Sequence, residues 1–131
     1  MNSGKPAKTK QPIITTSNCT YSRMLDLISN KWTVLIIYAL ENGSMRYGEL
    51  CRQIEGVSKK MLTQTLRQME RDGFVRREVT ASVPPIVDYS LTPLGETLIP
   101  PLKHLTQWTK DHYAHVDQAR VEFDKLNETL S

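Results

Sequence analysis

The chain has 131 residues, which is enough for one domain with a hydrophobic core but too few for two large domains. Hydrophobic residues make up 39% of it and charged residues 24%, proportions that are ordinary for a soluble globular protein. No apolar run approaches the roughly 20 residues of a membrane-spanning helix, and no apolar stretch follows the N-terminal lysines as it would in a signal peptide, so we expect a cytoplasmic protein.

The formal net charge of +3 is unevenly distributed. Residues 46–77 hold eight Lys or Arg against four Asp or Glu, a local charge of +4, whereas residues 80–131 hold four bases against seven acids, a local charge of −3. This asymmetry indicates that the middle of the chain meets a polyanion. The two cysteines are too few for a disulfide framework or a four-thiolate zinc site, and both are expected to be thiols in a reducing cytoplasm.

Residues 1–17 mix Pro, Lys, Thr and Ser and predict a flexible tail, followed by one structured domain over residues 18–131. Apolar residues at helical spacing predict a first helix from Thr20 to Ile28. A second helix, Lys31–Leu40, is capped by Asn30 and is apolar on nearly every side, so it should lie in the centre of the core.

The middle of the chain predicts a short helix over Tyr47–Gln53 and a longer one over Lys59–Arg71, which Ser58 caps and Asp72-Gly73 ends. Two short strands follow, joined by a loop that contains two prolines. The expected strands are Val75–Val79 and Val87–Leu91.

A final long helix is expected after Thr92, with Thr92 as its cap and Pro93 at its first position. The Pro100-Pro101 pair should kink or interrupt this helix. Its apolar stripe exceeds what one side of a small core needs, so part of it should meet a second copy of the chain. The stripe consists of Leu94, Leu98, Leu102, Leu105 and Trp108. The order of elements predicts a mostly α fold with a small β-hairpin, namely a winged helix-turn-helix with an additional C-terminal dimerisation helix.

The helix over residues 59–71 has two faces, one of which should pack inward through Leu62, Leu66 and Met69. The opposite face is polar and basic, as a reader of base edges in the major groove requires, because Arg67 can bind a guanine edge and Gln64 an adenine edge. Such a face by itself would favour an ordinary solvated helix, but its place after two helices and before a hairpin favours DNA. The expected DNA-binding residues of this helix are Lys59, Lys60, Thr63, Gln64, Arg67 and Arg71.

Further DNA contacts are expected from residues that flank this helix in the sequence. Arg46 and Tyr47 stand at the start of the preceding helix, where a charge and a hydroxyl can fix a phosphate; half-burial against the following turn is the alternative for Tyr47. Arg76 and Arg77 are neighbours on the first strand, so one of them should face DNA and the other solvent.

These segments resemble the HxlR-type family of bacterial regulators, a branch of the winged helix-turn-helix group near the MarR type. The resemblance extends in order and register from Cys19 to Trp108. It implies a homodimer, paired through the first and last helices, on double-stranded operator DNA of two-fold symmetry, and we expect repression of a neighbouring gene. The chain departs from the family at Thr20, where members often have Pro, and at the wing tip, which lacks an Arg or Lys. The matching segments include Ser29-Asn30-Lys31-Trp32, Arg46-Tyr47-Gly48-Glu49-Leu50, Ser58-Lys59-Lys60-Met61-Leu62-Thr63, Asp72-Gly73, Pro84-Pro85, Tyr89-Ser90-Leu91-Thr92 and Leu94-Gly95.

Cys19 and Cys51 are the candidates for a redox-sensing thiol. Cys19 stands at the expected start of the first helix, where unpaired amides and the helix dipole favour a thiolate and hence reactivity. The family resemblance implies that this cysteine senses an oxidant, quinone or aldehyde; a structural role is the alternative. Cys51 is expected in the core, and a Cys19–Cys51 bridge across the dimer would need a Cα separation under about 7 Å.

The sequence predicts no metal site, no cofactor and no catalysis. His112 and His115 share a helix face, but a transition-metal site needs three or four converging ligands, so these residues and His104 are interpreted as solvated or interface histidines. A glycine-rich phosphate loop, a Gly-x-Ser-x-Gly elbow and paired carboxylates in an apolar setting are all absent from the sequence. The alternative functions are a metal- or small-ligand-responsive winged-helix repressor, and a winged-helix module that binds protein.

Overall fold

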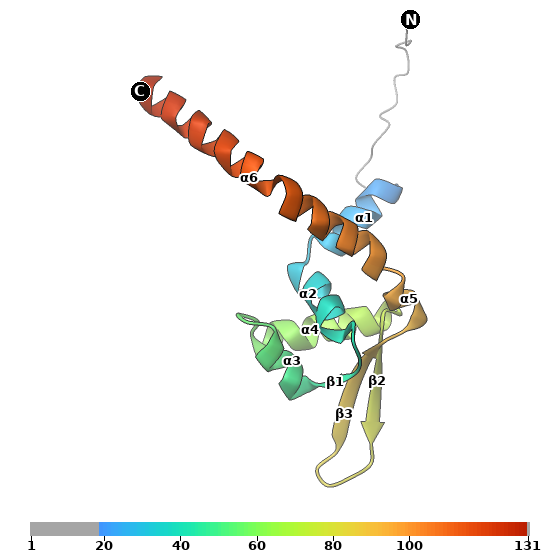
Figure 1. The fold of residues 1–131 in the computed structure, drawn as a ribbon. Helices are drawn as coiled ribbons and strands as arrows, with labels where there is room; N and C mark the ends of the chain where they lie inside the picture. Colours follow the sequence, from blue (N-terminus) through green and yellow to red (C-terminus); the bar gives the residue numbers. More distant parts are fainter. Residues whose placement is uncertain (1–18, 131) are drawn as a thin grey trace, which may run out of the picture.

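The computed structural model describes residues 19–130, so the tail expected at residues 1–17 lies outside the described residues. Figure 1 shows a central body from which a long helix extends at one end and a β-hairpin at the other. The first four helices have the bounds that the sequence predicts. In chain order the elements are α1 (Thr20–Ile28), α2 (Lys31–Leu40), β1 (Met45–Arg46), α3 (Tyr47–Gln53), α4 (Lys59–Arg71), β2 (Val75–Thr80), β3 (Ile86–Leu91), α5 (Pro93–Glu96) and α6 (Ile99–Leu130).

Side-chain caps fix where three of these helices begin. The side-chain oxygen of Asn30 accepts a hydrogen bond from the amide of Trp32 at 3.0 Å, and Ser58 accepts one from Met61 at 3.0 Å. Thr92 accepts one from Gly95 at 3.0 Å. Each bond satisfies an amide that has no partner within its own helix, so the caps predicted from the sequence are confirmed.

The core is built around α2, which contributes the buried residues Ile36, Ile37 and Leu40. Helix α4 packs against it with Leu62, Leu66 and Met69, as its predicted inward face requires. The expectation that α2 is central is confirmed, although Leu35 on its outer side remains 40% exposed.

The sheet has three antiparallel strands in the order β1-β3-β2. It contains the two-stranded hairpin expected from the sequence and one further strand, β1, that was not expected. Strand β1 is only two residues long and pairs with the free edge of β3, where Met45 lies opposite Tyr89. On the other edge, Arg77 of β2 lies opposite the same tyrosine. Tyr89 is therefore at the centre of the sheet, and it is buried.

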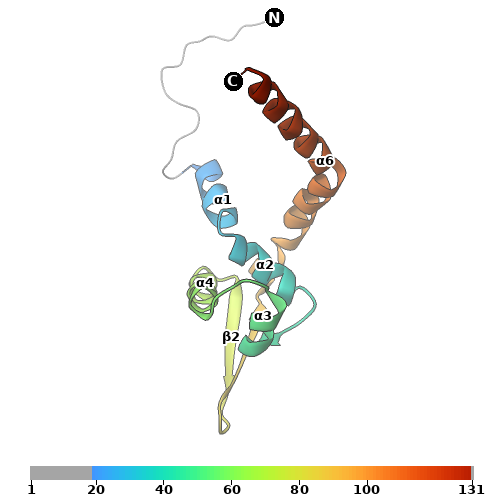
Figure 2. The same ribbon diagram turned by 90° about the vertical axis from the view of Figure 1, so that its left-hand side faces the viewer.

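The expected final helix is two helices, because the chain leaves helical conformation after α5 at Thr97–Leu98. The predicted interruption therefore occurs just before Pro100-Pro101, and both prolines fall in the first turn of α6, where a missing amide costs no helix hydrogen bond. Helices α1 and α6 leave the body on the side opposite the hairpin (Figure 2). Among the described helices, none is long and apolar enough to cross a membrane.

Candidate nucleic-acid interface

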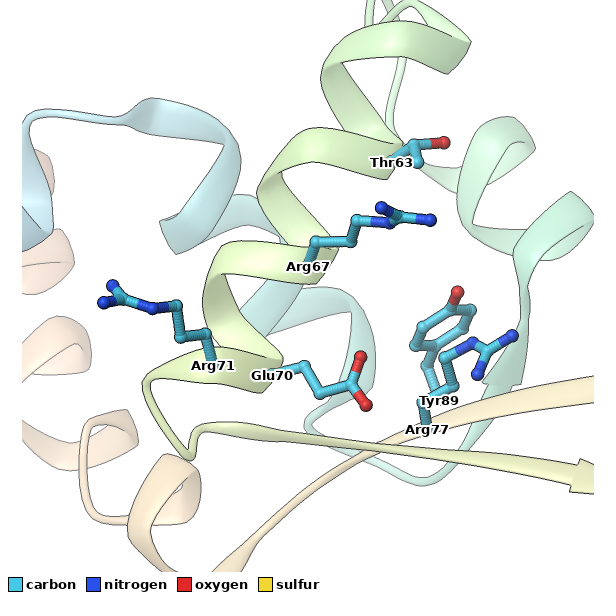
Figure 3. A pocket seen from close by; sticks show the side chains of 6 residues that line it. All are labelled: Thr63, Arg67, Glu70, Arg71, Arg77 and Tyr89. Carbon is cyan, nitrogen blue, oxygen red and sulfur yellow. The ribbon is translucent and has the colours of Figure 1, made fainter.

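A groove of about 690 Å³ lies between the outer face of α4 and the β2–β3 sheet. Figure 3 shows Arg67 and Glu70 extending from α4 on the side of Tyr89 and Arg77, while the guanidinium of Arg71 is directed away from them. With three arginines and one glutamate, the groove carries a net positive charge. Its lining residues are Thr63, Arg67, Glu70, Arg71, Arg77 and Tyr89.

The two ends of α4 hold this helix in place beside the sheet. After the Ser58 cap, α4 runs for 13 residues to Arg71, and the chain turns at Gly73, whose φ of +86° is accessible to glycine at little cost. The amide of Gly73 donates to the carbonyl of Glu70, and the amide of Phe74 donates to the carbonyl of Met69 at 2.9 Å. This Schellman arrangement turns the chain directly into β2, so the sheet begins next to the last turn of α4.

The structure brings together four of the expected DNA-binding residues. Thr63, Arg67, Arg71 and Arg77 all line the groove. Three more, Lys59, Lys60 and Gln64, are exposed on α4 but outside the groove lining. The exposed polar stripe on α4 is therefore confirmed as a surface, and its contact with DNA stays a prediction.

The strand register distinguishes Arg77 from Arg76. Arg77 lies opposite the buried Tyr89, whereas Arg76 lies opposite Ser90, and neighbouring positions on a strand point to opposite faces. Arg77 is therefore on the face that carries the groove, and Arg76 is on the other face of the sheet.

Sequence reasoning missed Glu70 and Tyr89 as lining residues of the groove. Glu70 is three positions after Arg67 on α4, so helical spacing already places the two side chains on neighbouring parts of one face. The alternation in β3 could have predicted the position of Tyr89. Tyr89 lies between two polar residues of this strand, so its side chain is on the apolar face of the sheet, where it is buried.

Arg46 and Tyr47 both stand at the start of α3, as expected, but their side chains have different surroundings. The backbone amide of Arg46 donates to Glu49 Oε1 at 3.0 Å. The side-chain Nε of Arg46 lies 3.9 Å from Asp88 Oδ1. The Tyr47 side chain is half-buried and its hydroxyl lies against α4, where it donates to the carbonyl of Lys59 at 3.1 Å. Tyr47 thus fastens the two helices of the helix-turn-helix to each other.

A family model described as HxlR-like helix-turn-helix matches residues 27–117. The chain belongs to the HxlR-like helix-turn-helix family. It is 39% identical over 111 residues to the HTH-type transcriptional regulator YdeP of Bacillus subtilis, and the match covers 82% of this chain and 87% of YdeP. The family assignment and the winged-helix fold expected from the sequence are confirmed, and the protein is a transcriptional regulator of the helix-turn-helix type.

Two solved structures resemble this HxlR-like regulator closely. The transcriptional regulator ytfH from Salmonella typhimurium is 40% identical, with a TM-score of 0.68, over 79% of this chain and 92% of that one. The redox regulator HypR in its reduced form is 35% identical, with a TM-score of 0.72, over 76% of this chain and 99% of that one. Both likenesses take in nearly the whole of the solved chain.

The two cysteines of the HxlR-like regulator are thiols, and both are half-buried. Cys19 is the N-cap residue of α1, and its Sγ accepts a hydrogen bond from the amide of Ser22 at 3.4 Å. Its expected position at a helix N-terminus is confirmed. Cys51 packs against the core from α3, as expected of a small apolar residue.

Two histidines of α6, His112 and His115, lie in a row with Trp108 along one side of the helix. The ring centroids of Trp108 and His112 are 5.3 Å apart, and those of His112 and His115 are 6.3 Å apart. Within residues 19–130, no group of three or more His, Cys, Asp or Glu side chains is placed to hold a metal ion. The metal-responsive alternative therefore gains no support from the described residues.

Proposed function

We propose that this HxlR-like regulator binds operator DNA with α4 in the major groove and represses a neighbouring gene. The observation that carries the proposal is the positive groove beside α4, in which Arg67 and Arg77 come from two different elements but line one concave surface. Arginine is the side chain best suited to both phosphate oxygens and guanine edges. A module that binds protein would not need such a surface.

Arg67→Ala tests the assignment of α4 as the recognition helix. The loss of a two-bond contact to a base should weaken operator binding by about 1–3 kcal/mol and relax base preference at one position of each half-site. Lys110→Ala, which removes a charge from the exposed surface of α6, is the matched control and should leave binding unchanged. Equal affinity of wild type and Arg67→Ala for both operator and random DNA would disprove the assignment.

Lys59 and Lys60 are proposed to contact phosphates. They occupy the first turn of α4, where exposed backbone amides also attract anions. Lys60→Ala should weaken binding to every sequence to a similar extent and reduce the slope of log affinity against log salt concentration by about 1. A salt slope identical to that of wild type would argue against a phosphate contact there.

A homodimer is supported by the apolar side chains that α1 and α6 leave uncovered. Helix α1 contains no buried residue, although Tyr21, Met24 and Leu25 are on it. In α6 only Leu102 is buried, while Leu105 and Trp108 remain 55% and 51% exposed. Since contiguous apolar patches mark interaction sites, we propose that these two helices pair with those of a second copy.

The oligomeric state is measured by sedimentation at micromolar concentration. Wild type should be a dimer, Trp108→Ala should shift it toward monomer, and the two recognition helices of the dimer should lie about 34 Å apart on an operator with two-fold symmetry. If wild type sediments as a monomer, both the proposed homodimer and the proposed two-fold symmetry of the operator are wrong.

Cys19 is proposed as the thiol through which an oxidant or electrophile releases the DNA. The amide of Ser22 points at its sulfur, which favours a thiolate, and the similar protein HypR is named a redox regulator. Operator affinity is compared before and after quinone treatment in wild type, Cys19→Ser and Cys51→Ser. Only Cys19→Ser should keep full affinity after treatment. A treated wild type with undiminished affinity would make Cys19 structural, and loss of the response in Cys51→Ser alone would assign the signal to Cys51.

The proposal assigns the protein no catalytic role and places its action in the cytoplasm, where an operator is accessible.

A further inference from the structure

The hydroxyl of Tyr47 joins two oxygen atoms of α4 from the side of α3. It lies 3.1 Å from the carbonyl oxygen of Lys59 and 3.0 Å from Thr63 Oγ1. Lys59 and Thr63 are one helical turn apart, so a single phenol spans both. Thr63 also lines the groove together with Arg67, the next residue along the same face.

One arrangement of the protons in this cluster makes both contacts of the Tyr47 hydroxyl hydrogen bonds. A carbonyl oxygen can only accept, so the contact with Lys59 uses the one proton of the Tyr47 hydroxyl. The Tyr47 oxygen must then be the acceptor in its contact with Thr63, and the Thr63 hydroxyl must be the donor. With its proton directed at Tyr47, Thr63 presents only lone pairs to a molecule in the groove.

We propose that Tyr47 makes Thr63 an obligate hydrogen-bond acceptor, and that Thr63 therefore reads an exocyclic amino group of a base in the major groove. The inference rests on the proposed function, since it requires α4 to lie in that groove. Tyr47 is a positioning residue in this arrangement, because it acts on DNA only through Thr63.

The base preference follows from the chemistry of the major-groove edges. Adenine carries an amino group where guanine carries a carbonyl oxygen, and cytosine carries one where thymine carries a carbonyl oxygen. An obligate acceptor therefore prefers adenine to guanine, or cytosine to thymine, according to which strand it reaches. A threonine whose proton is not committed would accept from one base and donate to the other, and would discriminate little.

Selection from a library of random duplexes gives the base preference at each operator position for wild type, Tyr47→Phe, Thr63→Val and Thr63→Ser. Affinities are then measured on single duplexes that differ only at the affected position. Wild type should prefer the amino-bearing base about fivefold, which corresponds to one exchanged hydrogen bond of about 1 kcal/mol. In Tyr47→Phe this preference should fall to about parity, while the preferences at other positions remain.

Two further variants separate the hydroxyl of Thr63 from its bulk. Thr63→Ser keeps the hydroxyl and should keep the preference, whereas Thr63→Val should lose it. The matched control is Tyr38→Phe, which removes a half-buried tyrosine hydroxyl that bridges α2 and α6, and it should alter no base preference.

An unchanged preference in Tyr47→Phe, or one retained in Thr63→Val, would overturn the inference. A wild type that selects no base at any position would instead refute sequence-specific DNA binding itself, so the two failures are distinguishable.

Discussion

The hydroxyl of Tyr38 donates a hydrogen bond to the backbone carbonyl of Leu102 at 2.8 Å, joining residues 64 positions apart in the sequence. This bond ties the central helix α2 to the first turns of α6, and Thr106 of α6 also contacts the same hydroxyl. The placement of α6 on the body therefore depends on this phenol, on the packing of Ile99 and Leu102, and on the ion pair between Lys103 of α6 and Glu41 at the end of α2.

Tyr38→Phe should lower the free energy of unfolding by about 1–2 kcal/mol, because the carbonyl of Leu102 and the hydroxyl of Thr106 lose a half-buried partner. The measurement is urea denaturation followed by circular dichroism. Tyr113→Phe is the control, since that hydroxyl accepts a hydrogen bond from Arg120 on the exposed surface and its loss should change stability by less than about 0.5 kcal/mol. Equal stability of the two variants would contradict the importance of the α2–α6 bond.

Arg77→Ala and Arg76→Ala form a matched pair on one strand. Arg77 is on the face of the sheet that carries the groove, so its removal should weaken operator binding by about 1 kcal/mol or more, and Arg76→Ala should have a clearly smaller effect. Fluorescence anisotropy with a labelled duplex measures both. A larger loss in Arg76→Ala would mean that the opposite face of the wing meets the DNA.

Thr65→Val should stabilise the protein. The Thr65 hydroxyl is buried within α4 and has no hydrogen-bond partner among the described residues, so replacing it with a methyl group should recover about 1–2 kcal/mol of desolvation cost. Thr92→Val makes the same chemical change where the hydroxyl caps α5 and also donates to the carbonyl of Gly73, and it should destabilise by about 1–2 kcal/mol. Thermal denaturation that shifted both melting points in the same direction would refute this account.

Gly95→Ala should be among the most damaging single substitutions in the chain. A Cβ at Gly95 would lie 2.2 Å from the carbonyl oxygen of Phe74, a backbone atom that cannot turn aside as the end of a flexible side chain could. We expect a loss of about 3 kcal/mol or more in the free energy of unfolding. Gly48→Ala is the counterpart within α3, where the added Cβ meets only the end of the Arg52 side chain, and it should stabilise by about 0.5–1 kcal/mol.

Local chemistry explains why the helix bounds could be predicted from the sequence. Asn30, Ser58 and Thr92 each accept an amide hydrogen bond within three positions in the chain, so the start of each helix is encoded next to it. Strand β1 escaped prediction because it is two residues long and shows no alternation. Its conformation comes from pairing with β3, more than 40 positions away.

The candidate interface also has one part that local sequence predicts and another part that depends on contacts between distant segments. Helical spacing alone predicted that Thr63, Arg67 and Arg71 share a face. Which of Arg76 and Arg77 joins them depends on the register between β2 and β3, and the contact of Tyr47 with Thr63 depends on the angle at which α3 meets α4. Neither the strand register nor the angle between the helices can be predicted from the sequence of one segment alone.

Helix α6 is held to α2 near its start, at Leu102 and Thr106, and its remaining residues 107–130 extend away from the body (Figure 1). At about 1.5 Å per residue these residues span about 36 Å, so a tilt of about 10° at Thr106 would move the far end by about 6 Å. A change in the packing around Tyr38 that is too small to disturb the core of one subunit would therefore reposition whatever is bound along the far part of this helix.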